Sequence, residues 1–237
     1  MVQQLSDFHP EVRAKVAETR QRVSNLHAEL PRWELVVWTA GNISERIIIA
    51  PSGEPSEQDI FVIKPSGVRY EELSAEAMVV CDIDGELIDG TRAPSSDTAA
   101  HAYVYKHMPE VGGVVHTHSS FATAWAARGE EIPCVLTMMA DEFGGPVPVG
   151  PFAIIGDDSI GRGIVETLRE SRSPAVLMQN HGPFTIGADA EKAVKAAVMV
   201  EEVARAVHLA KELGEPKPIP QDAIESLNNR YQNVYGQ

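Results

Sequence analysis

Cysteine is scarce in this 237-residue chain, which contains only Cys81 and Cys134. Two cysteines at this length do not make a disulfide framework, so we expect buried free thiols in a reducing, cytoplasmic compartment. Long apolar runs are also missing, and the first residues are polar with helical spacing. A membrane helix needs about 18 or more consecutive apolar residues, so we expect neither a membrane span nor a secretory signal.

Positive charge is in short supply, because 20 basic residues face 34 acidic ones and give a formal net charge of -14. Nucleic-acid binding needs a basic surface, so this balance argues against a DNA or RNA partner. An anionic small molecule would need a pocket that is locally positive within a repulsive field. The glycine fingerprint G-x-G-x-x-G is absent as well, which argues against a dinucleotide-binding fold.

What the sequence does contain is an interleaving of short apolar runs, bounded by turn residues, with helical spacing. Helices are expected at about residues 8–30, from near Ser96, and over 121–129, 160–171 and 189–214, followed by a short tail at about 221–237. Strands are expected within 33–44, 46–53, 59–67, 77–90, 111–119, 132–137, 145–154 and 174–187. We therefore predict one α/β domain over residues 1–237, with a mostly antiparallel central β-sheet flanked by helices.

Two histidines stand two residues apart at the end of the apolar run "GGVVHTHSS". Positions i and i+2 of a strand point to the same face, so His116 and His118 are placed to share one metal ion. The alternative is a pair of polar residues on an ordinary strand. His181 follows the buried run "AVLMQN" and adds a third imidazole at a strand end, which is the ligand number of catalytic zinc. Four other histidines on helical segments are expected to be solvated: His9, His27, His107 and His208.

A polar helix start follows in "PSSDTAAH", with Ser95, Ser96 and Asp97 as its first residues. These residues can form a helix N-cap whose carboxylate favours the helix dipole. They can also form an anion cradle of two hydroxyls and free backbone N–H groups, with Asp97 turned to a metal.

Two further strand ends carry polar residues. The turn "IKPSG" offers Lys64, Ser66 and Gly67, and it can be a plain turn or one side of a phosphate pocket. Asn42 follows a glycine in "TAGNIS" at another strand end. Each of these signals is weak by itself.

The order of the motifs is far more specific than any one of them. The series "GNIS", "IKPSG", "PSSD", "HTH", "AD", "NHGPF" and "YGQ" closely resembles the class II aldolase/epimerase family, from about residue 33 to the C-terminus. The family's sugar-phosphate 4-epimerases carry an aspartate in the "SSD" motif, whereas its aldolases carry a glutamate acid/base there. Asp97 therefore favours the epimerase branch. Met139 and Glu142 depart from that branch, which has a histidine and an aromatic residue at these positions.

The resemblance assigns roles to individual residues. It implies metal ligands at His116, His118 and His181 with Asp97, phosphate contacts at Asn42, Lys64, Ser66, Gly67, Ser95 and Ser96, and a catalytic pair at Asp141 and Tyr235. It implies one Zn²⁺ per subunit, with Mn²⁺ and Co²⁺ as alternatives. It also implies a C4 homotetramer with active sites between subunits.

The activity implied by the resemblance is metal-dependent interconversion of L-ribulose 5-phosphate and D-xylulose 5-phosphate, both pentulose phosphates. The reaction would proceed by retro-aldol cleavage of C3–C4 and re-addition. One alternative is a class II aldolase or related lyase that releases a free aldehyde. Another is a non-enzymatic scaffold like the adducin head, which would be expected to lack the metal ligands.

Overall fold

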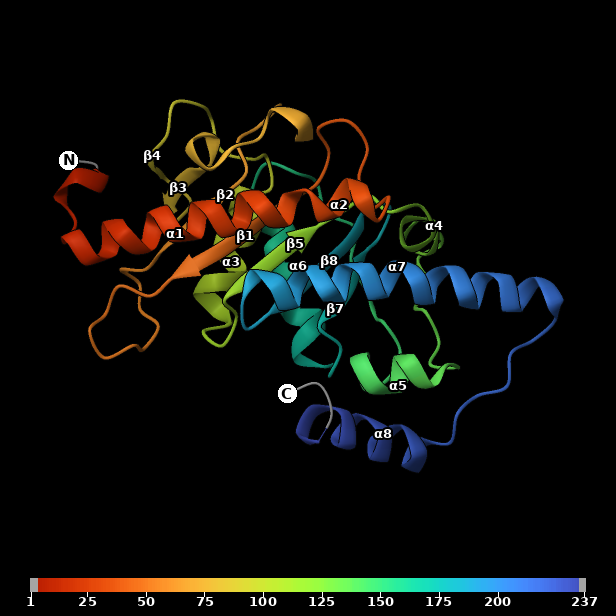
Figure 1. Cartoon of the computed structure of the whole chain (residues 1–237). Coiled ribbons are helices and arrows are strands. Elements are labelled where there is room, and N and C mark those ends of the chain that lie inside the picture. Colours follow the sequence, from red (N-terminus) through yellow and green to blue (C-terminus); the bar gives the residue numbers. More distant parts are fainter. Residues whose placement is uncertain (1–3, 235–237) are drawn as a thin grey trace.

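An eight-stranded sheet runs through the centre of the molecule, with the strand order β4-β3-β2-β1-β5-β8-β7-β6. The computed structural model describes residues 4–234, and Figure 1 shows how helices cover the sheet. The strands are β1 (Asn42–Ile47), β2 (Ile60–Ile63), β3 (Val79–Asp82), β4 (Leu87–Asp89), β5 (Gly113–His116), β6 (Val149–Gly150), β7 (Ala175–Met178) and β8 (Gly182–Gly187).

The single α/β domain with a helix-flanked sheet agrees with the sequence prediction, but the strand directions need a correction. The prediction was a mostly antiparallel sheet, and the sheet is mixed, because β6 pairs with β7 in parallel. The other pairings described are antiparallel. Helix α6 (Ser159–Arg169) lies between β6 and β7 and supplies the crossover that parallel neighbours need.

Helices cover both faces of the sheet because the strand side chains alternate between two cores. Helices α1 (Pro10–His27) and α7 (Ala190–Leu213) pack on one face, where Val62 and Val115 are buried. Helices α3 (Thr98–His107) and α6 pack on the other face, where Phe61 and Val114 are buried. The period of two along β2 and β5 thus sorts the two layers. Figure 1 shows α1 and α7 on the same side of the sheet.

The remaining helices complete the fold. They are α2 (Glu29–Arg32), α4 (Ser120–Arg128), α5 (Thr137–Phe143), α8 (Gln221–Asn233) and the 3-10 turns Leu5–Asp7, Tyr70–Glu72 and Ala75–Ala77. Helices α4, α5 and α7 share a third core with Trp125, Phe143 and Leu177. Gly129 and Gly144 close α4 and α5 in left-handed conformations, as helix-ending glycines often do.

Three local expectations differ from the structure. Residues 33–41 form a loop rather than a strand, because Glu34 and Trp38 have positive φ angles of 57° and 59°. Residues 132–136 keep only an isolated bridge between Ile132 and Val147, since the nearby prolines lack the N–H that a ladder requires, and Thr137 already begins α5. The expected C-terminal tail folds into α8 up to Asn233.

The strand ends that carry the polar motifs lie next to one another in the middle of the sheet. Asn42 at the start of β1 pairs with His116 at the end of β5, and His116 pairs with Phe184 of β8. The antiparallel pairing brings these strand ends together at one end of the central strands, and the histidine motifs therefore converge there. Within residues 4–234, no helix combines the length and apolarity needed to cross a membrane.

Candidate active site

Three histidines converge at this end of the central strands β5 and β8. His116 ends β5 and is fully buried, while His118 follows it in the connection to α4. His181 lies in the short turn between β7 and β8, where Asn180 adopts a left-handed conformation with φ 59°. One ring nitrogen from each histidine lies within 4.8 Å of the others. The structure therefore brings the three sequence-predicted imidazoles together.

The rings are oriented as metal ligands would be. His116 Nδ1 lies 3.0 Å from the Pro183 carbonyl oxygen, so this nitrogen carries the proton and Nε2 has a free lone pair. His116 Nε2 is 2.9 Å from His118 Nε2. Two nitrogens bound to one tetrahedral zinc lie about 3.3 Å apart, given Zn–N bonds of about 2.05 Å. The Phe184 ring stacks on His116 at 4.1 Å and fixes its plane.

Electrostatics keep the three imidazoles neutral, which is the form that binds a metal. Burial, followed by the repulsion that His181 and His118 would exert if protonated, holds the pKa of His116 well below its ordinary value. Burial likewise lowers the pKa values of His118 and His181, and the nearby carboxylate of Asp97 opposes the shift in both.

The contacts of Asp97 argue against one of the two interpretations of the helix start, a side-chain N-cap. It occupies the N-cap position of α3, but its side chain makes no capping hydrogen bond. Its Oδ2 instead accepts from Asn42 Nδ2 at 2.7 Å, and its Oδ1 is buried without a hydrogen-bond partner. A 5% exposed carboxylate with an unpaired oxygen beside three neutral imidazoles fits a cation. The donor set suits a transition metal, and its carboxylate would offset the ion's charge.

Asn42 connects the metal-binding residues to the phosphate candidates. Its Nδ2 also donates to Ser95 Oγ at 2.9 Å, and the side chain is 1% exposed. Gly41 lets the chain approach β5 here, because a Cβ at this position would lie 2.9 Å from the His116 carbonyl oxygen. Its φ of 79° also favours glycine.

The two polar turns run side by side. Ser95 N donates to the Lys64 carbonyl oxygen at 3.0 Å, and Ser66 N donates to that of Ala93 at 2.9 Å. Lys64 is 2% exposed, its Nζ donates to the carbonyl oxygens of Thr39 and Pro65, and it lies 5.5 Å from the centre of the Tyr70 ring. Burial lowers its pKa to about 8. A buried lysine without a carboxylate partner is ready to receive an anion.

Ser66, Gly67 and Ser96 lie on the exposed side of the same two turns. Gly67 has a φ of 68°. All six predicted phosphate residues therefore lie on β1, the turn after β2 and the start of α3.

The predicted catalytic pair is not assembled in the same way. Asp141 lies on α5, which packs against α7 and α8, and its carbonyl oxygen accepts from Asn228 Nδ2 at 3.0 Å. No described interaction joins Asp141 to the histidines. Tyr235 lies outside the described residues.

Two buried histidines were not recognised in the sequence. His101 Nδ1 lies 2.6 Å from Ser44 Oγ, which also bonds the Tyr105 hydroxyl at 2.7 Å, and its Nε2 has no partner. His27 was expected in solvent but is 1% exposed, and its Nε2 accepts from Ile43 N at 3.1 Å. Burial lowers the pKa of each to about 3. The spacing of His101, one helical turn after Asp97, was the available signal.

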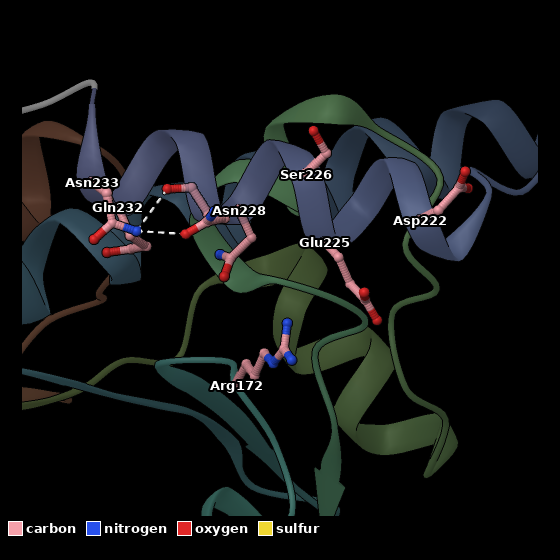
Figure 2. A pocket seen from close by; sticks show the side chains of 8 residues that line it. Arg172, Asp222, Glu225, Ser226, Asn228, Gln232 and Asn233 are labelled. Carbon is pink, nitrogen blue, oxygen red and sulfur yellow. Dashed lines mark hydrogen bonds between the residues drawn. The ribbon is translucent and has the colours of Figure 1, made fainter.

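A polar hollow of about 600 Å³ lies between α8 and the loop after α6. Figure 2 shows the Arg172 side chain directed toward α8, whose Glu225 and Asn228 also line the hollow. None of the sequence-predicted site residues lines it. We therefore place the candidate active site at the histidine cluster.

Comparison with known proteins agrees with this geometry. The class II aldolase and adducin N-terminal domain matches residues 21–208. This chain belongs to the class II aldolase family. That membership confirms the resemblance found in the motifs. The family is metal dependent, and the histidine cluster could hold the metal.

This chain is similar in sequence and structure to several individual proteins. It is 42% identical over 201 residues to the L-ribulose-5-phosphate 4-epimerase UlaF of Salmonella paratyphi B, covering 81% of this chain and 85% of that protein. The same protein of Salmonella typhi gives the same values. A solved L-fuculose 1-phosphate aldolase matches with TM-score 0.81 and 26% identity, over 91% of this chain and 96% of the other. A putative aldolase/epimerase/decarboxylase from Klebsiella pneumoniae, YgbL, matches with TM-score 0.74 and 29% identity, over 90% and 99%.

Proposed function

We propose that the protein is a metal-dependent epimerase that interconverts L-ribulose 5-phosphate and D-xylulose 5-phosphate. The observation that carries the proposal is the connection made by Asn42, which donates both to Asp97, beside the three imidazoles, and to Ser95, whose backbone N–H donates to the Lys64 carbonyl oxygen. Identity of 42% to proteins named L-ribulose-5-phosphate 4-epimerase supports the same reaction. Asp97, where the family's aldolases have glutamate, favours the epimerase.

The chemistry explains why an epimerase uses an aldolase site. The hydrogen on C4 of a 2-ketopentose phosphate is not acidic, because C4 lies β to the carbonyl. Simple deprotonation therefore cannot invert this carbon. Breaking the C3–C4 bond gives the enediolate of dihydroxyacetone and glycolaldehyde phosphate. Rotation of the aldehyde and re-formation of the bond on its other face complete the inversion.

The chain's polar turns hold the phosphate while the aldehyde rotates. Lys64 supplies the positive charge, and Ser95 and Ser96 supply hydroxyls at the start of α3. Asn42, Ser66 and Gly67 complete the cradle. This arrangement keeps glycolaldehyde phosphate bound between the two carbon–carbon steps, which an epimerase requires and an aldolase does not.

His116, His118 and His181, together with Asp97, would hold one metal ion per subunit. Lewis-acid stabilisation of the enediolate charge is the chemistry that the metal supplies when bound. Imidazole-rich sites favour zinc and its neighbours in the affinity series over magnesium, so we propose Zn²⁺, with Mn²⁺ and Co²⁺ as alternatives.

Asp141 and Tyr235 would exchange a proton with the C4 oxygen on the two faces of the aldehyde. We also propose a homotetramer with fourfold cyclic symmetry, in which a neighbouring subunit completes each active site. The position of Asp141 on α5, without a described contact to the histidines, supports this. The free cysteines, with Cys81 buried and Cys134 half-buried, support a cytoplasmic location.

Product analysis after chelation and metal replacement tests the proposal. The zinc-loaded protein should convert L-ribulose 5-phosphate to D-xylulose 5-phosphate without net release of aldehyde. The chelated protein and His118→Ala should be inactive, whereas His208→Ala, at an exposed histidine, should behave as wild type. Undiminished conversion by the thoroughly chelated protein would overturn the metal-dependent reaction.

The second candidate is a class II aldolase or lyase, favoured by the structural similarity to L-fuculose 1-phosphate aldolase. An aldehyde-trapping reagent separates the two, because an aldolase releases stoichiometric aldehyde from its substrate. Accumulation of trapped glycolaldehyde phosphate in place of D-xylulose 5-phosphate would favour this candidate.

A further inference from the structure

Lys195 joins two helices that contact each other beside it. Its Nζ lies 2.8 Å from Glu142 Oε2 on α5 and donates to the Tyr231 hydroxyl on α8 at 2.7 Å. The same ammonium lies 4.9 Å from the centre of the Tyr231 ring. Lys195 itself projects from α7, whose opposite side is buried on the sheet through residues such as Ala193 and Ala197. A cation on a fixed helix therefore holds both partners.

Its two partners are neighbours of the proposed acid–base pair. Glu142 directly follows Asp141, and Tyr231 of α8 lies four residues before Tyr235 in the sequence. Lys195 thus adds a polar link between Glu142 of α5 and Tyr231 of α8 to the packing of these two helices.

Helices α5 and α8 also interlock at Asp141. Asn228 Nδ2 donates to the Asp141 carbonyl oxygen at 3.0 Å. Gly144 ends α5 with φ 64°, and a Cβ there would come within 3.0 Å of the Asn228 side chain. Lys195, Glu142, Tyr231 and Asn228 line one hollow of about 850 Å³.

The ion pair is partly shielded from solvent. The Glu142 side chain is only 10% exposed, although that of Lys195 is 50% exposed. Burial acts to lower the pKa of Lys195, but the hydrogen bonds to Glu142 and Tyr231 outweigh it and raise the pKa. Lys195 therefore keeps its charge at neutral pH. Glu142 stands where the family resemblance expects an aromatic residue, so the contact depends on this chain's own side chains.

We propose that Lys195 is a positioning residue, which fixes α5 and α8 against α7 and thereby holds Asp141 of α5 in place. The proposal rests on the proposed function, because it needs Asp141 to move the proton. Misplacement of a catalytic group by about 1 Å can cost about 100-fold in rate. The contacts of Lys195 can therefore affect turnover without touching the substrate.

Substitution of Lys195 gives the kinetic test. Lys195→Met keeps the aliphatic stem and removes the ammonium, and it should lower kcat about 10- to 100-fold with KM and metal content unchanged. Lys195→Arg keeps the charge and should restore most of the turnover. Lys192→Met is the matched control, because Lys192 lies one turn earlier on α7 and lines the same hollow. It should retain wild-type kinetics.

Hydrogen exchange of the backbone amides in α8 gives a readout that does not depend on the reaction. Exchange over residues 221–233 should be about tenfold faster in Lys195→Met than in wild type, and unchanged in Lys192→Met. Wild-type exchange and turnover in Lys195→Met would overturn the proposal, as would equal losses in both variants. A wild-type protein without epimerase activity, but with the expected exchange pattern, would instead overturn the proposed function and retain the helix contact.

Discussion

The side-chain amide of Asn42 donates to Asp97 Oδ2 at 2.7 Å and so joins the start of β1 to the start of α3. The same amide donates to Ser95, which places the carboxylate beside the phosphate candidates. Asp97 Oδ1 is left without a hydrogen-bond partner. A buried carboxylate needs a nearby positive charge, which a metal ion would supply. Asn42 therefore connects the metal candidates to the phosphate candidates.

Asp97→Asn should weaken metal binding about 10- to 100-fold, because it removes the charge while keeping the shape of the side chain. Competition with a chromophoric chelator measures the affinity. Asp84→Asn is the control, since Asp84 is exposed and pairs with Lys106 on the surface. Equal metal affinity in Asp97→Asn and wild type would show that this carboxylate does not serve the metal.

The pH dependence of substrate binding should report on Lys64. Burial lowers its pKa to about 8, so the charged form predominates below this pH and is lost above it. The second pKa of a phosphate monoester is about 6, so the substrate stays doubly charged over this range. The KM for L-ribulose 5-phosphate should therefore rise as the pH increases above about 8.

Lys64→Met provides the matching variant for this dependence. It should raise KM below about pH 8, where Lys64 is charged, since much of the phosphate contact is equal in the ground and transition states. It should also remove the rise above pH 8. An unchanged KM in Lys64→Met would place the phosphate elsewhere.

Ser44→Ala should lower the free energy of unfolding by about 1–3 kcal/mol, because it leaves His101 Nδ1 and the Tyr105 hydroxyl unpaired in the core. Thr123→Val is the control, since Thr123 Oγ1 is buried without a partner and its removal loses no hydrogen bond. Urea denaturation of the two variants measures the difference. Equal stabilities would mean that Ser44 is not needed to satisfy the two groups.

Much of the site could be predicted from the sequence because its residues lie in local motifs with a fixed order. His116 and His118 share a face by strand periodicity, and His181 follows a second buried strand. The long-range relationship between Asn42 and His116 depends on strand order, which no local pattern encodes. His101 was missed because its one signal, a spacing of one helical turn after Asp97, does not by itself indicate burial.

The fold was predicted where apolar periodicity was strong, and the errors lie where backbone constraints prevail. The pattern over 189–214 predicts the long helix α7 (Ala190–Leu213) within a residue at each end. The expected strand over 33–44 begins only at Asn42, because Glu34 and Trp38 adopt left-handed backbone conformations that apolar spacing does not reveal. The parallel β6–β7 pair was missed, since β6 has only two residues, Val149 and Gly150.

Tyr235→Phe should lower turnover about 10²- to 10⁴-fold, the effect of losing a general acid or base. A phenol has a reference pKa near 10, so it is neutral at pH 7 and can donate a proton to a forming alkoxide. Metal content and oligomeric state should stay unchanged. Tyr103→Phe, at a tyrosine that stacks on His107, is the control. Wild-type turnover in Tyr235→Phe would remove this tyrosine from the proton transfer.

The central claim is inversion at C4 by cleavage of the C3–C4 bond, and a deuterium label on C4 tests it most directly. Retro-aldol cleavage leaves the C4–H bond intact, whereas deprotonation at C4 would exchange this hydrogen with solvent. The measurement is NMR of the products formed in ordinary water from L-ribulose 5-phosphate deuterated at C4, incubated with the zinc-loaded protein. The account predicts D-xylulose 5-phosphate that retains the deuterium. Absence of conversion, or conversion with loss of the label to solvent, would contradict it.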